Sequence, residues 1–328
     1  MEKRINTYLA IALTTCCNYK CFYCKNGGES ISKKEETIPF NQIKKIISNA
    51  NDIGINNFRI TGGEPTSVNY FGELIEYIMK FKDTKARINT NGFKILNYIN
   101  ILEKYKEQLD IVFSVDSISE YLEGVHFQKY LSENVVKITK VLRENGIPVR
   151  YNIVVTKLNE CEVKELVLKA VDELGVNVKL LDLNKFSEYF GYCNSVRGED
   201  AFNLWKELFV PMRKFQNFLD EISNDSRAEW TTQLISKGHG IPMSAYFRRD
   251  NWIQVKDSTR GAKYSEFCIK ECRFYKTNNC QEGVFSLFLS SNLMLHLSGC
   301  KNNSIHYDLS EQDDEKIKEA FKKLLNLI

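Results

Sequence analysis

Residues 8–24, YLAIALTTCCNYKCFYC, join an apolar run to three cysteines at a fixed spacing. The apolar run is typical of a β-strand that is buried on both faces. Cys17, Cys21 and Cys24 follow it, with three and then two residues between them. A loop at the carboxyl end of a strand can fold three thiolates around a [4Fe–4S] cluster and leave one iron open. Structural zinc normally takes four ligands, and the first 125 residues contain no histidine, so a zinc site or a set of buried thiols is the weaker interpretation.

Short β-rich runs and helical runs continue to alternate up to about residue 184. Five further strands are predicted, at residues 57–61, 86–90, 110–116, 149–156 and 176–183. Apolar residues recur at helical spacing between them, for example over 71–81 and 163–174. Six strands with intervening helices predict an α/β fold, an open partial (βα)6 TIM-like barrel. Its functional residues are then expected at the carboxyl ends of the strands.

The rest of the chain departs from this repeat. Residues 199–222 carry an apolar stripe at helical spacing, whereas 224–265 read as irregular. Residues 284–300 predict a β-hairpin, and 311–326 predict a last helix that begins with acidic residues. We therefore expect three parts: a core barrel at 1–190, a helical and irregular region that determines the substrate at 191–265, and a small Cys-rich α+β extension at 266–328.

A second motif, TGGEP at 61–65, ends the second predicted strand. The Cys-x3-Cys-x2-Cys spacing, with the aromatic Tyr23 before the last cysteine, and this TGGEP motif together resemble the signature of the radical S-adenosylmethionine (radical SAM) superfamily. The resemblance implies that the open iron binds SAM and that reductive cleavage gives a 5′-deoxyadenosyl radical, which abstracts hydrogen from a substrate. Cys16, next to the first ligand, is expected to point away, because neighbouring residues of an extended chain alternate faces.

The same resemblance implies a set of SAM contacts at the later strand ends. Gly62 and Gly63 allow close backbone approach to a ligand, and Glu64 offers an acceptor for the SAM amino group. Polar residues also end the third, fourth and fifth predicted strands or lie within them, although the capping of strand ends would explain them as well. The expected SAM-binding residues are Tyr23, Gly62, Gly63, Glu64, Pro65, Thr90, Ser114 and Asn152.

A second cysteine group comprises Cys268, Cys272, Cys280 and Cys300, with three, seven and 19 residues between them. Four thiolates would also suit zinc. The whole chain is similar to radical SAM proteins with a twitch or SPASM extension, which implies an auxiliary [4Fe–4S] cluster held by Cys268, Cys272 and Cys300. Cys280 either completes that cluster or is left out, in which case an open iron can bind substrate directly.

The order of the motifs, the run SVDS at 114–117 and the late cysteines resemble the GTP 3′,8-cyclase-like branch of molybdenum-cofactor synthesis. The departures concern cations: that branch has Arg where this chain has Ala10, and an Arg-rich strand where this chain has VFSLFLSSN at 284–292. Losing groups that would pair with a triphosphate argues against GTP. The remaining hypotheses are a maturase acting on a precursor peptide, an enzyme acting on a small molecule such as a nucleoside, and a metal-binding protein without catalysis.

Composition limits the partners. The formal net charge is only +3 and no block of Lys and Arg stands out, so no nucleic-acid partner is expected. No stretch approaches the roughly 18 apolar residues of a membrane span, and we expect a cytoplasmic protein reduced by a donor such as flavodoxin or ferredoxin.

His126 is a candidate proton donor, although a lone loop histidine is usually only solvated. Candidate substrate contacts are Arg197, Arg227, Trp230, His239, Tyr246, Arg248, Arg249 and Trp252.

Overall fold

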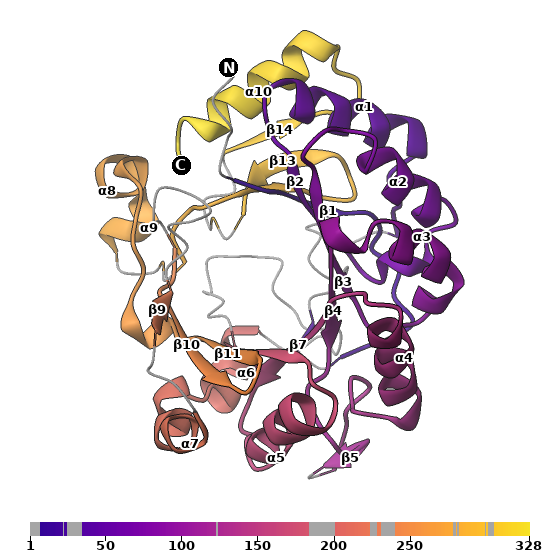
Figure 1. Cartoon of the computed structure of the whole chain (residues 1–328). Coiled ribbons are helices and arrows are strands. Elements are labelled where there is room, and N and C mark those ends of the chain that lie inside the picture. Colours follow the sequence, from indigo (N-terminus) through magenta and orange to yellow (C-terminus); the bar gives the residue numbers. More distant parts are fainter. Residues whose placement is uncertain are drawn as a thin grey trace.

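A 12-stranded sheet curves around a central space, and helices cover its outer side in the computed structural model of the chain (Figure 1). The strands run in the order β14-β13-β12-β1-β2-β3-β4-β7-β8-β11-β10-β9. The structure describes residues 7–21, 23–24, 35–122, 124–183, 201–223, 228–230, 240–277, 280, 282–298, 300 and 305–328.

The six predicted strands are confirmed and lie side by side in parallel. One further parallel strand extends this run at each end, because β12 pairs with β1 and β11 pairs with β8. The parallel strands are β1 (Leu9–Ala12), β2 (Asn57–Thr61), β3 (Lys85–Thr90), β4 (Leu109–Ser114), β7 (Val149–Val155), β8 (Asn177–Asp182), β11 (Asn251–Lys256) and β12 (Leu287–Leu289). The predicted partial barrel of six parallel strands is therefore extended at each edge by one parallel strand from the C-terminal half of the chain.

Antiparallel strands close both edges of the sheet. They are β9 (Ala228–Trp230) and β10 (Met243–Arg248) beside β11, and β13 (Met294–Leu297) and β14 (His306–Asp308) beside β12. The predicted hairpin near the C-terminus is thus confirmed as β12 and β13. A separate small hairpin joins β5 (Tyr121–Leu122) to β6 (Val125–His126).

One expectation for the middle of the chain was wrong. The stretch 224–265 is not irregular throughout, since it contains β10 and β11, joined by a two-residue turn in which Arg249 takes a left-handed φ of 52°. The helical stretch expected at 199–222 is observed as two helices, α6 (Ala201–Leu208) and α7 (Gln216–Ile222). Pro211 lies between them, and a proline has no backbone N–H to continue a helix.

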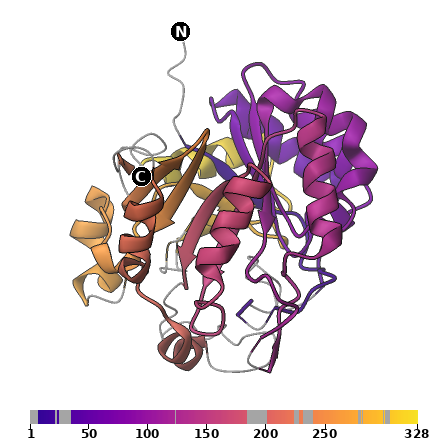
Figure 2. The same ribbon diagram turned by 60° about the horizontal axis from the view of Figure 1, so that its bottom comes forward.

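Helices cover the outer face of the sheet, as Figure 2 shows from a second direction. Besides α6 and α7, the α-helices are α1 (Phe40–Asp52), α2 (Phe71–Ile78), α3 (Ile99–Lys104), α4 (Glu133–Glu144), α5 (Val163–Leu168), α8 (Glu266–Glu271), α9 (Arg273–Lys276) and α10 (Asp314–Leu325). Single helical turns are η1 (Pro65–Ser67), η2 (Ile95–Tyr98), η3 (Lys106–Gln108), η4 (Lys169–Glu173), η5 (Met212–Phe215) and η7 (Ser258–Arg260). The predicted last helix, α10, packs beside α1 and so ties the C-terminal extension to the barrel. No helix in the described ranges is long and apolar enough to cross a bilayer.

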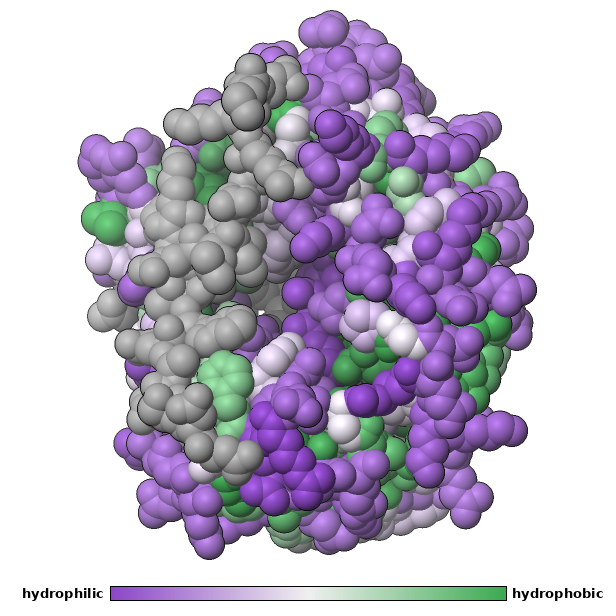
Figure 3. Space-filling view, in the orientation of Figure 1, coloured by the Kyte–Doolittle hydropathy of each residue, from purple (hydrophilic) through white to green (hydrophobic). Residues whose placement is uncertain are grey.

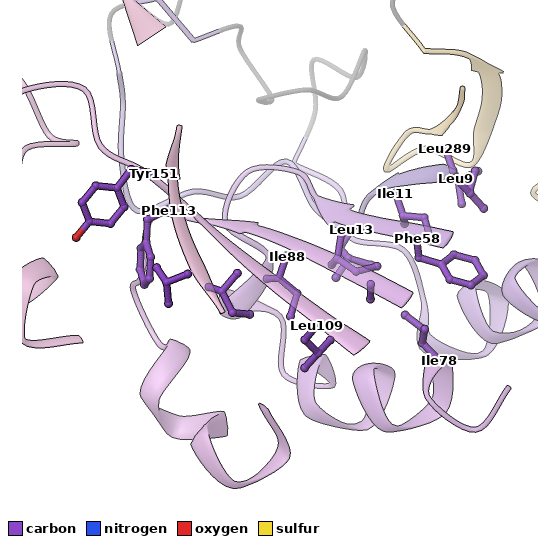
Figure 4. Packing of buried hydrophobic residues seen from close by; sticks show 14 of the residues in the cluster. Leu9, Ile11, Leu13, Phe58, Ile78, Ile88, Leu109, Phe113, Tyr151 and Leu289 are labelled. Atoms are coloured by element: carbon purple, nitrogen blue, oxygen red, sulfur yellow. The ribbon is translucent and has the colours of Figure 1, made fainter. Parts of the chain in front are cut away.

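The hydrophobic core lies between the sheet and the helices (Figure 4). Leu9, Ile11 and Ile88 are fully buried there, and the rings of Phe113 and Tyr151 meet edge to face at 6.3 Å. Burying one such side chain contributes about 1.5–3 kcal/mol to folding.

The other face of the same strands is mixed: Ala10, Ala12 and Phe288 form a small apolar cluster there, whereas β3 and β7 place polar and charged side chains on it. We expected strands buried on both faces, but all four residues of β1 are buried while β2, β3 and β8 alternate. The middle of the molecule is hollowed, and the residues visible along its right-hand wall are hydrophilic (Figure 3). Part of the inner face of the sheet is therefore polar.

Candidate active site

Cys17, Cys21 and Cys24, the expected cluster ligands, lie in the loop that follows β1. The amide of Cys24 donates to the carbonyl of Cys21 at 3.0 Å, and the amide of Tyr19 donates to the Cys17 sulfur at 3.3 Å. Burial raises the pKa of Cys17 and brings that of Cys21 to about 12, and the charges of the neighbouring cysteines add to both shifts. The three thiols are therefore close enough to influence one another. Within the described residues, no three Cys, His, Asp or Glu side chains converge on a single-ion site.

Gly62 and Gly63 bring the end of β2 against this cysteine loop. The amide of Gly63 donates to the carbonyl of Thr14 at 2.6 Å, and the amide of Glu64 donates to the carbonyl of Cys16 at 2.8 Å. A Cβ atom on Gly63 would lie 2.1 Å from the carbonyl oxygen of Cys16, and one on Gly62 would lie 2.5 Å from that of Thr14. The close approach that we expected toward a ligand is thus made toward the cysteine loop.

The carboxylate of Glu64 joins the ends of β2 and β3. It is 1% exposed, and Oε1 accepts from the Thr66 amide at 3.0 Å, the Thr66 hydroxyl at 2.5 Å and the Thr90 hydroxyl at 2.6 Å. Its Oε2 accepts from the Asn91 amide at 2.8 Å. Pro65 follows Glu64 and begins the turn η1. Glu64 and Thr90, both expected to touch SAM, therefore also bind each other and shape this edge of the barrel.

Replacing Glu64 with alanine should weaken SAM binding by at least about tenfold, because several buried donors would lose their acceptor at roughly 1–3 kcal/mol each. Isothermal titration of the anaerobic protein with SAM measures this change. The first cluster should stay in place, and Ser67→Ala, which removes a hydroxyl that only reaches the Glu64 carbonyl, is the matched control. An unchanged affinity in Glu64→Ala would contradict the role of this carboxylate.

Asn91, which the sequence reading did not single out, links this edge to the cysteines. Its side-chain amide donates to Asn18 Oδ1 at 2.9 Å and lies 3.8 Å from the Cys17 sulfur. The signal was present in the sequence, because Asn91 directly follows the expected SAM contact Thr90 at the end of a strand.

Tyr23 is anchored by Asp116, which belongs to the run SVDS at 114–117, and by Lys129, which the sequence did not indicate. Its hydroxyl donates to the buried carboxylate of Asp116, and the ammonium of Lys129 donates to the hydroxyl at 3.1 Å. The other oxygen of Asp116 accepts from the Val154 amide at 2.9 Å. The Lys129 ammonium also lies 5.2 Å from the centre of the Tyr23 ring. These contacts fasten the cysteine loop to the segments that follow β4.

Ser114 and Asn152 lie side by side on neighbouring strands, with Ser114 of β4 in register with Asn152 of β7. Both belong to the polar inner face and are partly buried. The buried oxygen of the Asn152 amide has no hydrogen-bond partner among the described residues, so it can accept a hydrogen bond from a bound molecule. Asn152 thus offers a ligand one acceptor within the expected SAM site.

The candidate substrate contacts separate into different places. Arg248 and Arg249 both pair with Asp172, so they hold β10 to the turn η4. Tyr246 is buried, and the ring of Trp252 lies 5.8 Å from the Arg150 guanidinium. Arg197, Arg227, His239 and the side chain of Trp230 lie outside the described residues. The exposed His126, the candidate proton donor, stacks on Tyr121 and lies 3.2 Å from Glu120.

The second cysteine group begins on α8. Cys268 and Cys272 are buried, and the Cys268 sulfur accepts a hydrogen bond from the Ser265 hydroxyl at 3.4 Å. Burial raises the pKa of Cys268, and the charges of Cys272 and Cys280 raise it further, although the hydrogen bonds from Ser265 act in the opposite direction. Cys268, Cys272 and Cys280 are thus neighbours, and Cys300 follows the hairpin strand β13.

Known proteins share this arrangement. Residues 11–170 match the Radical SAM superfamily. A probable GTP 3′,8-cyclase from Thermococcus kodakarensis is 26% identical, covering 97% of this chain and 94% of that relative. A GTP 3′,8-cyclase from Alkaliphilus oremlandii is 30% identical, covering 64% of this chain and 67% of that relative.

Solved structures show the same fold. Streptococcus suis SuiB, bound to SAM, superposes with a TM-score of 0.63 at 18% identity over 94% of this chain. This chain spans 64% of the length of SuiB, which has also been solved with its precursor peptide SuiA. The chain is therefore an enzyme of the radical SAM superfamily, whose members use a [4Fe–4S] cluster, SAM, a substrate and a reductant.

Proposed function

We propose that Cys17, Cys21 and Cys24 hold the [4Fe–4S] cluster and that SAM lies along the carboxyl ends of β2, β3, β4 and β7. Three neighbouring thiols at one strand end suit a cluster that keeps one iron open. When bound, the cluster and SAM supply hydrogen abstraction by radical chemistry. The chain's own part is to hold the loop through Gly63 and Tyr23 and to offer polar groups at Ser114 and Asn152.

We propose a small polar molecule, held inside the barrel, as the substrate. The polar inner face of the sheet carries this proposal. In a closed barrel that face is normally filled by branched apolar side chains, whereas here Arg87, Asn89 and Asn152 occupy part of it, beside the apolar cluster of Ala10, Ala12 and Phe288. A hollow lined by such groups suits a compact, hydrogen-bonding substrate placed directly below SAM.

Two other substrates remain as competing proposals. The relatives named above are GTP 3′,8-cyclases, but the absence of Arg at Ala10 and in 284–292 leaves the cations expected for a triphosphate missing at those places. SuiB has been solved with a precursor peptide. At 18% sequence identity, however, the similarity supports a shared fold and not a shared substrate. Membership of the family sets aside the hypothesis of a metal-binding protein without catalysis.

Label transfer tests the proposal. Deuterated polar metabolites, deuterated peptides and deuterated GTP are each incubated with reduced enzyme and SAM, and the 5′-deoxyadenosine is examined for deuterium. We expect label from a small polar metabolite. Transfer from a peptide or from GTP alone would overturn the substrate proposal, and no 5′-deoxyadenosine under any condition would overturn the radical chemistry.

We further propose that the second cysteine group holds an auxiliary [4Fe–4S] cluster of the twitch or SPASM type. Cys268, Cys272 and Cys280 are close enough for their charges to interact. The hydroxyl of Tyr264 donates to the carbonyl of Cys280 at 2.6 Å and so fixes that part of the chain. With Cys300 as a fourth ligand, each of the four irons would have a cysteine ligand and none would be open to substrate, which suits an electron relay.

Replacing Cys280 with alanine tests whether it is a ligand of this auxiliary cluster. We expect an altered electron paramagnetic resonance spectrum for the auxiliary cluster, because one iron would lose its thiolate. Cys161→Ala, which removes an exposed thiol on another part of the surface, is the matched control. An auxiliary spectrum identical to that of the wild type would show that Cys280 is not a ligand.

A reductant has to supply one electron to the first cluster for each SAM molecule that is cleaved. We propose flavodoxin or ferredoxin for this role, in the cytoplasm, where free thiols persist. The described cysteines form no disulfide among themselves, which suits that compartment.

A further inference from the structure

Two strongly exposed apolar side chains each lie beside one of the cysteine groups. Phe93 is 50% exposed and lies two residues after Asn91, whose side chain lies 3.8 Å from the Cys17 sulfur. Ile269 is also 50% exposed and directly follows Cys268. Because single exposed apolar residues are common on protein surfaces, the surroundings of each decide what it can do.

A short chain of contacts joins Phe93 to Cys17. The Phe93 amide donates to Asn91 Oδ1 at 3.0 Å, and the Asn91 Nδ2 donates in turn to Asn18 Oδ1 at 2.9 Å. Asn91 is buried, whereas Cys17 and Asn18 are exposed. Electron transfer between two groups slows steeply as the distance between them grows. A carrier protein that touches the Phe93 ring would therefore have a short route to this proposed cluster ligand.

Two exposed cations border the same segment. The Lys94 ammonium lies 5.2 Å from the centre of the Phe93 ring, and Lys20 is exposed next to Cys21. Neither ammonium forms an ion pair with a carboxylate among the described residues. Such cations attract a protein whose surface is acidic.

The carboxylates that border the cysteine loop do not cover these cations. Glu64 and Asp116 are buried, and the charge of Asp116 is offset by the neighbouring ammonium of Lys129. Glu35 and Glu36 adjoin the start of the loop, where the Glu36 carbonyl accepts a backbone hydrogen bond at 2.9 Å. The exposed ring and the two exposed ammonium groups are therefore available to an acidic partner.

The surface around Ile269 is different. Cys268 beneath it is only 4% exposed, whereas Cys17 is exposed. The exposed charges of α8 and α9 are of both signs, namely Glu266, Lys270, Glu271, Arg273 and Lys276. Lys270 is already paired with Glu266. This mixed surface over a buried thiol favours electron entry at Phe93 rather than at Ile269.

We propose that Phe93 and Lys94, with Lys20 along the same loop, form the docking surface on which an acidic one-electron carrier protein reduces the first cluster. The inference rests on the proposed function, because it takes Cys17 as a cluster ligand. The reduced carrier loses one electron and the cluster gains it, and no atom is exchanged. Redox encounters of this kind bury less than about 1,200 Å² in total, so one ring with nearby cations can form the centre of such an interface.

A comparison of two reductants tests this surface on the anaerobic full-length protein with both clusters in place. Reduced flavodoxin is an acidic carrier that has to dock, whereas dithionite is a small ion that does not. Phe93→Ala and Lys94→Glu should each lower 5′-deoxyadenosine formation with flavodoxin by at least about tenfold, because attraction between complementary charges governs such encounters. Formation with dithionite should stay unchanged. Phe93→Ala keeps the backbone amide that donates to Asn91, so the cysteine loop retains this contact.

Matched controls remove the same kinds of side chain elsewhere. Tyr121→Ala removes an aromatic side chain that is 67% exposed on the small hairpin, and Lys140→Glu reverses an exposed charge on α4. Both variants should accept electrons from flavodoxin as the wild type does.

Binding gives a second readout that does not depend on turnover. Calorimetric titration of the protein with oxidised flavodoxin should show a Kd that rises with ionic strength, since salt screens exposed charges. Lys94→Glu should raise this Kd at low ionic strength by at least about tenfold and weaken its dependence on salt.

The inference is overturned if Phe93→Ala and Lys94→Glu accept electrons from flavodoxin at the wild-type rate. A loss that occurs only in Ile269→Ala would also overturn it, because electrons would then enter beside the second cysteine group. An equal loss with dithionite would contradict a docking role as well. The proposed function is judged separately, by SAM cleavage in the wild type with dithionite, which bypasses the docking surface.

Discussion

Replacing Cys17, Cys21 and Cys24 together with alanine is expected to abolish 5′-deoxyadenosine formation from SAM. The proposed cluster has no other described thiol in its loop except Cys16, which is exposed and whose carbonyl already serves the Glu64 amide. Without three thiolates the open iron that binds SAM cannot be held. The auxiliary cluster should persist, so the variant should keep about half of the wild-type iron.

The measurement compares iron content, the spectrum of the reduced clusters and product formation with dithionite under anaerobic conditions. Cys16→Ala is the matched control, because it removes an adjacent thiol that is not expected to be a ligand and should leave all three quantities unchanged. A triple variant that still cleaves SAM would show that the radical chemistry starts elsewhere in the chain.

The barrel strands could be predicted because their signal is local. The run at 57–61 is observed with the same bounds as β2, and the other five predicted strands differ by one or two residues at their ends. The pairing of β11 with β8 and of β12 with β1 could not be predicted, because it joins segments that are far apart in the chain. Local periodicity carries no information on which distant strand will be the neighbour.

In the candidate site, too, the local motifs could be predicted from the sequence, whereas contacts between distant residues could not. The cysteine spacing and the TGGEP motif are compact, so they could be read directly. The anchor of Tyr23 could not, since Asp116 and Lys129 lie 93 and 106 positions away from it. The polar lining was visible in principle, because Arg87 and Asn89 alternate with apolar residues in KARINT at 85–90. A strand buried on both faces does not alternate in this way.

Replacing Gly63 with alanine is expected to lower SAM cleavage by about 100-fold, because a displacement of about 1 Å at a catalytic centre can cost that much. The new Cβ would lie 2.1 Å from the Cys16 carbonyl oxygen and 2.5 Å from its carbonyl carbon, and both are backbone atoms. The cysteine loop has to move away, and the hydrogen bonds from Gly63 to Thr14 and from Glu64 to Cys16 have to lengthen. Overpacking of this kind also costs about 1–3 kcal/mol of stability.

The rate of 5′-deoxyadenosine formation, the iron content and the Tm of Gly63→Ala are compared with those of Gly124→Ala. A Cβ on Gly124 would meet no atom within 4 Å, although its φ of +76° adds a cost of about 1–2 kcal/mol for a side chain. The control thus carries the general penalty of losing a glycine without disturbing the cysteine loop. Loss of SAM cleavage in Gly63→Ala alone would tie the second motif to the first through the backbone of Cys16, whereas equal activity of the two variants would contradict that link.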